Sequence, residues 1–172
     1  MALRSTAPAT GTPTYEEYVA ARWTPLYRTA YLLTANHADA EDLVQTTLVK
    51  TYLSWSKVAG ASSPDGYVRR ILTNAFLSGR RPLRVSRERL VDQAPDVEVA
   101  SPDSHDRLTL WPHIATLPPR QRAVIVLRYY EDLSEQQIAD TLGCSTGTVK
   151  STASDALRSL RSRMAGTEGD PS

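Results

Sequence analysis

The stretch that decides the fold is LSEQQIADTLGCSTGTVKSTASDALRSL, residues 133–160. Its apolar spacing predicts two short helices joined by a tight turn, with the second helix continuing as a longer amphipathic tail. Ser134 is a good N-cap for the first helix, and Gln137 three residues later completes a capping box. Gly143 falls where that helix must end, at a positive φ that glycine tolerates best. Ser145 is then expected to cap the second helix.

Three positions in this stretch have the spacing of a helix-turn-helix. Ala139 is small enough for the two helices to approach closely, Gly143 forms the turn, and Val149 packs the second helix onto the first. The outward side chains of the second helix are short hydroxyls and one lysine, which bond phosphates and base edges in a major groove. The residues expected to contact DNA are Ser145, Thr146, Thr148, Lys150, Ser151 and Thr152. A plain helical hairpin with solvated faces is the alternative, and the agreement of the spacing with two caps favours DNA binding.

The composition is that of an ordinary globular protein, with 172 residues, 41% hydrophobic content and a net charge of +1. The charge is unevenly distributed. Seven arginines lie between residues 64 and 90, whereas residues 91–106 hold five acidic side chains and no lysine or arginine. Such a cationic block favours nucleic acid or an acidic partner. No run approaches the ~20 apolar residues of a membrane span, and no secretory signal opens the chain, so we expect a cytoplasmic protein without membrane contact.

Side chains that could carry catalysis are few and scattered. Cys144 is the only cysteine, and the three histidines lack metal-ligand spacing. No glycine-rich phosphate loop or nucleophile elbow occurs. Asp39, Glu41 and Asp42 are too close along one helix to share a direction, so helix capping and a partner contact account for them better than a metal ion. We therefore expect no enzyme, no metal site and no cofactor.

Helical periodicity also fills the N-terminal half. Thr14 and Glu17 form a second capping box, and the helix that follows is expected to kink or break at Pro25. Asp39 is expected to cap the next helix, which runs to about Trp55.

The outer face of that second helix is more apolar than solvent requires, because it carries Val49 and Leu53, and this suggests a partner surface. Lys57–Ser63 reads as a flexible loop, after which Ser63 and Pro64 start a third helix that ends at Gly79. The residues expected to project from the third helix are Arg69, Arg70, Thr73, Asn74 and Ser78.

Residues 86–106 combine prolines with acidic side chains and show no helical period, which is typical of an extended linker. The predicted organisation is a lead at 1–13, a helical domain at 14–85, the linker at 86–106, a helical domain at 107–165 and a tail at 166–172. Residues 123–130 could pass for a strand, but the preceding prolines and the helical neighbours favour a helix, with Arg120, Arg122 and Arg128 on its outer side. The expected fold is all-α, with two small helical domains joined by an extended acidic linker.

Three segments resemble a known family. Asp39–Gln45 (DAEDLVQ) resembles the second conserved region of bacterial sigma factors, and Tyr67–Asn74 with Arg80 and Arg81 resembles the promoter-melting helix that follows it. Leu117–Tyr130 and the hairpin resemble the fourth region. Their order, without a third-region domain between them, resembles the extracytoplasmic-function (ECF) group. The amino-acid sequences of the third helix and the hairpin are similar to those of its actinobacterial SigE-like branch.

The resemblance implies a set of contacts for the first domain. The partner would be core RNA polymerase, bound at the clamp helices of its largest subunit by Asp42, Gln45, Thr46 and Val49. The loop with Lys57 and Gly60 would take a flipped base of the minus-ten element. Unstacking a base costs a few kcal/mol, so cationic support is needed. That support would come from Arg69, Arg70, Asn74, Arg80 and Arg81.

For the second domain the resemblance implies that the hairpin reads the minus-thirty-five element of promoter DNA, while Arg120 and Arg122 bond the backbone. The hairpin turn would lie near the flap of the second-largest polymerase subunit, the acidic linker would cross the polymerase cleft, and an anti-sigma factor is a further partner that the family allows. Two residues depart from the family pattern: Ser78 replaces a common aspartate, and Asp155 replaces a common arginine.

Two other classes of protein compete with this interpretation. A stand-alone helix-turn-helix regulator would need a receiver or ligand-binding domain, and residues 14–84 show no strand alternation or phosphoacceptor pattern. A helical adaptor that binds only protein leaves the arginine block and the hairpin spacing unexplained.

Overall fold

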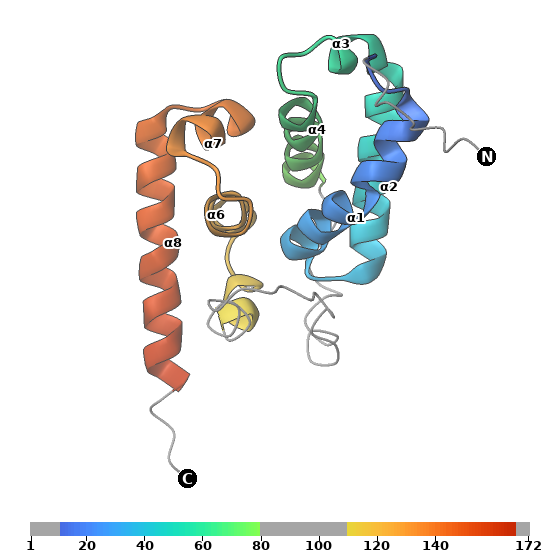
Figure 1. The fold of residues 1–172 in the computed structure, drawn as a ribbon. Coiled ribbons are helices and arrows are strands. Elements are labelled where there is room, and N and C mark those ends of the chain that lie inside the picture. Colours follow the sequence, from blue (N-terminus) through green and yellow to red (C-terminus); the bar gives the residue numbers. More distant parts are fainter. Residues whose placement is uncertain (1–10, 80–109, 168–172) are drawn as a thin grey trace, which may run out of the picture.

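The computed structural model describes residues 11–79 and 110–167, and these contain helices and connections but no strand (Figure 1). The predicted all-α class is therefore confirmed. The helices are α1 (Tyr15–Thr34), α2 (His37–Leu53), α3 (Trp55–Ala59), α4 (Pro64–Ser78), α6 (Pro119–Ile125), α7 (Glu135–Leu142) and α8 (Thr146–Thr167). A helical turn spans 110–114, and α6 continues into a π-helical turn at Val126–Tyr130. The predicted linker and the residues Arg80 and Arg81 lie outside the described ranges.

Helix α1 begins at the predicted capping box, in which the Thr14 hydroxyl accepts from the Glu17 amide and the Glu17 carboxylate accepts from the Thr14 amide. It then continues through Pro25 as one helix, so of the predicted kink or break the break does not occur. Buried side chains flank the proline, with Tyr18 before it and Leu33 after it. Packing on both sides offsets the one hydrogen bond that proline removes.

The start of α2 also differs from the prediction. Asn36, not Asp39, is the N-cap, and its side-chain oxygen accepts from the Asp39 amide at 3.0 Å. Asp39 lies in the first turn, where a carboxylate suits the positive end of the helix dipole. The predicted loop starts too early as well, because Lys57 is part of α3 and the irregular segment is 60–63.

Helix α4 has the predicted ends. The Ser63 hydroxyl accepts from the Gly66 amide at 3.1 Å, Pro64 occupies the first turn, and Gly79 is the C-cap. Val68 and Leu72 are fully buried. Thr73 was expected to project but is fully buried, because the C-terminal domain covers that face of α4.

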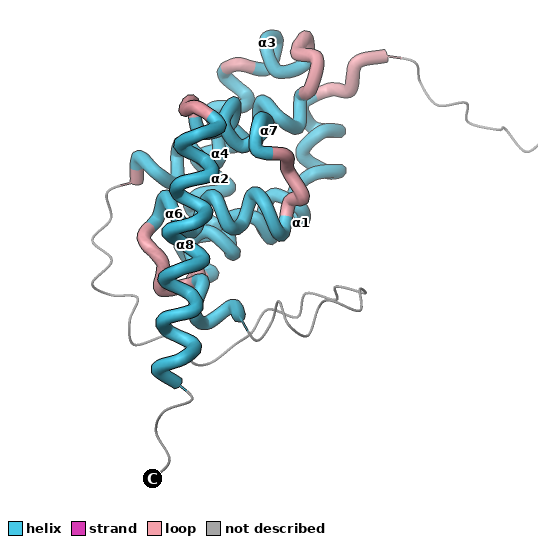
Figure 2. Tube along the Cα trace, turned by 90° about the vertical axis from the view of Figure 1, so that its left-hand side faces the viewer, coloured by secondary structure: helices cyan, strands magenta, loops and turns pink. Residues whose placement is uncertain are grey.

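Helices α1, α2 and α4 form one bundle, and α6, α7 and α8 form a second group that lies against it (Figure 1). In the view turned by 90°, α8 crosses in front of α6 and extends toward the C-terminus (Figure 2). The contact between the groups runs from α4 to α7 and from α1 and α4 to α6. Ala123 and Val126 belong to the same buried cluster as Leu33 and Leu72. The two helical groups thus share a core, which the sequence did not indicate.

None of the helices in the described ranges is both long enough and apolar enough to cross a membrane.

Candidate nucleic-acid interface

The helix-turn-helix has the local geometry that its sequence predicts. The Ser134 hydroxyl accepts from the Gln137 amide and the Gln137 side chain accepts from the Ser134 amide, which closes the capping box. Gly143 ends α7 in the left-handed region at φ 65°. Ala139 and Val149 are 2% and 1% exposed, so α7 and α8 are locked together at the two positions that the motif requires.

Because α7 packs against one side of α8, the other side of α8 faces solvent. Thr148, Lys150 and Ser151 are exposed, whereas Thr146 and Thr152 are half-buried. The exposed Ser145 hydroxyl caps α8 by accepting from the Thr148 amide at 3.1 Å. Six neighbouring candidates for DNA contact therefore sit at the start of one helix, in the geometry that places side chains in a major groove.

Charges around α8 are paired across its surface. Glu135 at the start of α7 lies 3.6 Å from the Lys150 ammonium and 3.6 Å from the Arg128 guanidinium. Asp155 accepts from Arg158 at 3.0 Å. Exposed pairs of this kind contribute little to stability and exchange readily for phosphate. The surface is thus partly cationic. The carboxylates of Glu135 and Asp155 compete with DNA phosphates for its lysine and arginine side chains.

The two arginines predicted to bond the DNA backbone have different surroundings. Arg120 is exposed. Arg122 is only 5% exposed, and its guanidinium donates to the carbonyl oxygens of Leu33 at 2.7 Å and Leu117 at 3.0 Å. Burial lowers the pKa of Arg122 from its ordinary value. In this arrangement Arg122 does not lie on an outer face and cannot reach a phosphate, contrary to the expectation from sequence.

Helix α4 carries the described part of the minus-ten candidates. Arg70 and Asn74 are exposed, as are Lys57 and Gly60 near the start of the helix. Arg69 is half-buried and lies 3.7 Å from Glu131, which precedes the hairpin.

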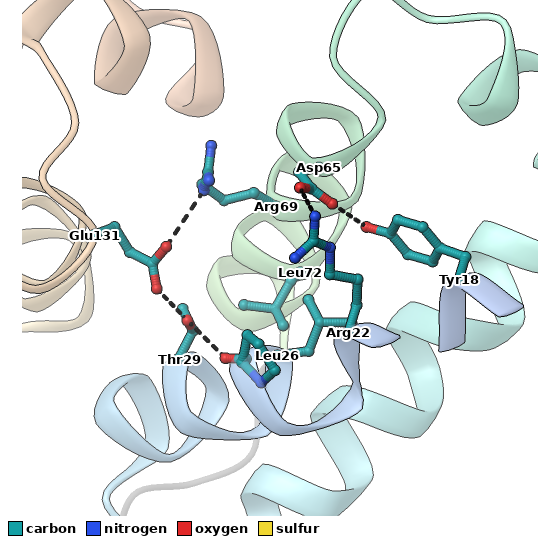
Figure 3. A pocket seen from close by; sticks show the side chains of 9 residues that line it. Tyr18, Arg22, Leu26, Thr29, Asp65, Arg69, Leu72 and Glu131 are labelled. Carbon is teal, nitrogen blue, oxygen red and sulfur yellow. Dashed lines mark hydrogen bonds and ion pairs between the residues drawn. The ribbon is translucent and has the colours of Figure 1, made fainter. Parts of the chain in front are cut away.

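A cleft of about 220 Å³ separates α1 and α4 from the residue that joins the π-helical turn to the hairpin (Figure 3). At one end Arg22 pairs with Asp65 at 2.8 Å, and the Tyr18 hydroxyl donates to Asp65 at 3.0 Å. Burial raises the pKa of Tyr18, and the hydrogen bond to Asp65 raises it further, so this phenol stays protonated.

At the other end of the cleft, Glu131 accepts a hydrogen bond from the Thr29 hydroxyl and faces Arg69 (Figure 3). Sequence reasoning missed Thr29 and Glu131 as interacting residues. They are 102 positions apart, and no local pattern connects a mid-helix threonine with an acid in a loop.

The predicted polymerase-binding residues share one face of α2. Asp42, Gln45, Thr46 and Val49 are all exposed, opposite the buried stripe of the helix. The face continues into two large apolar side chains, Tyr52 at 61% and Leu53 at 77% exposure. The sequence indicated Leu53 but missed Tyr52, whose ring packs edge-on against Tyr15. An apolar patch of this kind on a helix surface is typical of a protein-binding site.

Comparisons with known proteins show the family to which the chain is similar. Residues 20–84 match the family model for Sigma-70 region 2, and residues 113–162 match that for Sigma-70, region 4. The RNA polymerase sigma-E factor of Streptomyces avermitilis is 40% identical over 152 residues, which are 87% of this chain and 84% of that protein. The ECF RNA polymerase sigma factor SigL of Mycobacterium tuberculosis is 34% identical over 153 residues, covering 86% and 84%.

A solved structure has the same fold. The sigma factor RpoE in complex with the anti-sigma factor NepR, from Bartonella quintana, matches with a TM-score of 0.65 at 26% identity, over 88% of this chain and 96% of that one.

A region 2 domain followed by a region 4 domain is the pair that sigma-70-type initiation factors share. The chain belongs to the extracytoplasmic-function group of RNA polymerase sigma factors. Its function is to direct promoter-specific initiation of transcription, and it acts as a regulator of initiation. A stand-alone regulator is not favoured, because residues 20–84 match the model for Sigma-70 region 2.

Proposed function

We propose which surfaces of this sigma factor bind core polymerase and which bind promoter DNA. The exposed face of α2 with Asp42, Gln45, Thr46 and Val49 docks on the clamp helices of the largest polymerase subunit. Tyr52 and Leu53 extend that contact, since their exposed apolar area is of the kind that protein interfaces bury. With this assignment, the protein acts in the cytoplasm together with the transcription machinery.

The two DNA surfaces lie on α4 and α8. Arg70 and Asn74, with Lys57 and Gly60 beside them, support the separated strand of the minus-ten element. The start of α8 reads the minus-thirty-five element in the major groove, with Lys150 as its cation. Arg80 and Arg81, beyond the described residues, would extend the α4 surface, and Arg120 would bond the backbone.

The exposure of Thr148, Lys150 and Ser151 on a helix locked by Ala139 and Val149 is the observation that carries the proposal. A rigid helix with its polar residues outward is what base reading requires.

A partner that restrains the factor is also proposed. The RpoE structure contains the anti-sigma factor NepR, and its similarity to this chain over 88% of the length makes an anti-sigma factor a reasonable partner here. The flap of the second-largest subunit is the proposed contact of the hairpin turn.

The test is transcription from a mapped promoter by core RNA polymerase with the protein or a variant. Lys150→Ala should reduce specific transcript several-fold and lower the dependence of promoter affinity on log[salt] by about one unit, as loss of one phosphate contact does. Arg161→Ala is the matched control, because Arg161 is an exposed cation on the same helix outside the proposed site. Equal losses in both variants would contradict the assignment of α8.

A further inference from the structure

Trp23, in the middle of α1, is a large aromatic side chain that the fold leaves partly uncovered. It is 39% exposed. Tyr15, Tyr18 and Tyr27 of the same helix each hydrogen-bond through their hydroxyls to another helix. Within residues 11–79 and 110–167, by contrast, Trp23 makes no aromatic ring contact and its indole N–H has no hydrogen-bond partner. A buried indole normally bonds its N–H, so this position suits a ring that a partner buries.

The direction of Trp23 follows from its neighbours along α1. Arg22 pairs with Asp65 of α4 at 2.8 Å, so that side of α1 faces α4. One residue further on, Trp23 is rotated around the helix by about 100°. Val19 and Tyr27, four residues before and after Trp23, pack against the buried cluster that α1 shares with α2. Trp23 therefore lies on the α2 side of α1, away from α4.

Two contacts give the level of Trp23 along α2. Near the start of α1, the Tyr15 ring packs edge-on against Tyr52 with 5.1 Å between the centroids. Further along, the Tyr27 hydroxyl lies 2.6 Å from Nδ1 of His37, the first residue of α2. The two helices are thus antiparallel and side by side (Figure 1). Trp23 falls between Tyr15 and Tyr27 and nearer to Tyr27, so it lies beside the first half of α2.

Trp23 and the docking residues of α2 form one continuous surface. In the first half of α2, Asp42 and Gln45 are exposed, and Val49 and Tyr52 continue the surface at 59% and 61% exposure. A single exposed apolar side chain is ordinary, but three large ones on adjacent helices form a patch of the kind that marks a protein-binding site. We call this surface the α1–α2 face: Trp23, Asp42, Gln45, Val49 and Tyr52.

The chemistry of the α1–α2 face defines the surface that would fit it. Exposed carboxylates of Glu41 and Asp42 lie in the half of α2 beside Trp23, so a complementary surface is basic and has an apolar hollow for the indole. Tryptophan is enriched among the few interface residues that dominate binding energy. The face is also accessible, because α2 lies on the side of the N-terminal bundle away from α7 and α8 (Figure 1).

We propose that Trp23 is an anchor of the core-polymerase contact, so that the docking site spans α1 and α2 instead of α2 alone. Its ring enters an apolar hollow of the largest subunit, and its indole N–H donates to an acceptor there. This inference rests on the proposed docking of α2 on the clamp helices, and it adds a residue from a second helix.

Truncation of the indole tests the anchor. Trp23→Ala removes the ring, and Trp23→Phe keeps an aromatic ring without the N–H donor. Tyr129→Ala is the matched control, because it truncates an aromatic side chain of nearly the same exposure, 40% against 39%, in the C-terminal helical group. The melting temperature of each variant is measured first, since Trp23 is also partly buried.

Affinity is read by competition, in which each unlabelled variant displaces the dye-labelled wild-type chain from core polymerase. Trp23→Ala should bind roughly ten- to thirtyfold more weakly, the size of a hot-spot truncation, and Trp23→Phe roughly threefold more weakly. The loss should be the same at about 0.1 M and about 0.4 M salt, because salt screens charge pairs and not apolar contacts. Tyr129→Ala should bind like the wild type.

A second measurement does not depend on the stability of the alanine variant. The photo-cross-linking amino acid p-benzoylphenylalanine, placed at position 23 of the full chain, should cross-link to the largest subunit in the holoenzyme. Wild-type affinity of Trp23→Ala, an equal loss in Tyr129→Ala, or no cross-link from position 23 to the largest subunit would overturn the proposal.

Val49→Asp separates this proposal from the proposed docking of α2. A loss of binding in Val49→Asp but not in Trp23→Ala would leave the α2 contact in place and refute the anchor. A loss in Trp23→Ala with a cross-link to the largest subunit, but no loss in Val49→Asp, would support the anchor and refute the assignment of the α2 face.

Discussion

Asp155 is an acidic residue on the exposed side of the helix proposed to read DNA. Its side chain is 53% exposed and accepts from Arg158 at 3.0 Å, while the Arg158 side chain is 74% exposed. The Asp155 carboxylate therefore repels DNA phosphates. It also pairs with the Arg158 guanidinium, which could otherwise bind a phosphate. We predict that Asp155→Arg strengthens binding to a duplex with the minus-thirty-five element.

The size of the effect follows from counting phosphate contacts. Arginine at position 155 adds one contact, and release of Arg158 adds a second. Each steepens the dependence of log Kobs on log[salt] by about 0.9, so the slope should change by about 1.8 and affinity near 0.1 M salt should rise roughly tenfold or more. Asp155→Asn only releases Arg158, so about half of that slope change is expected.

The assay is fluorescence anisotropy of labelled duplex titrated with protein across a salt series. Glu16→Arg is the control, because it makes the same net charge change at an exposed position in α1, far along the chain from α8. An unchanged slope in Asp155→Arg, or an equal gain in Glu16→Arg, would refute the reasoning that this carboxylate opposes DNA locally.

Three further predictions test the turn, the buried arginine and the docking face. Gly143→Ala should lower the unfolding free energy by about 1–2 kcal/mol, because φ is 65° and the added Cβ meets nothing within 4 Å, so only backbone strain acts. Urea denaturation measures this loss of stability, and the control Gly147→Ala in α8 should not destabilise the fold. Arg122→Lys should cost about 1–3 kcal/mol in the same assay, since one ammonium cannot replace two diverging donors to Leu33 and Leu117; unchanged stability would contradict that bonding. Val49→Asp should weaken core polymerase binding by about tenfold or more, because it places a charge in the buried interface. Its melting temperature should not change, because Val49 is 59% exposed. The control Ser56→Asp should bind core polymerase normally, and equal binding by both variants would exclude this face.

Local features of this fold were predictable because their causes are local. The caps at Thr14, Ser63 and Ser134 each depend on a hydroxyl and an amide three residues apart, and all three occur as predicted. Gly143 has the expected positive φ for the same reason, since the turn needs a residue without a side chain.

Features that depend on tertiary packing were the ones that sequence reasoning missed. The helix that contains Pro25 stays continuous because buried residues on both sides hold it. Thr73 and Arg122 looked like surface residues from their helical positions, and both are buried because the two domains pack together. No short-range pattern relates Arg122 to the Leu33 carbonyl, 89 positions away.

The most direct test of the central claim is initiation by core RNA polymerase on a fork-junction promoter mapped from transcription starts after overexpression. Core enzyme with this protein should start transcription at the mapped position, and neither component alone should do so. A protein that binds the duplex promoter without core enzyme, and adds no specific start when core enzyme is present, would contradict its assignment as a sigma factor.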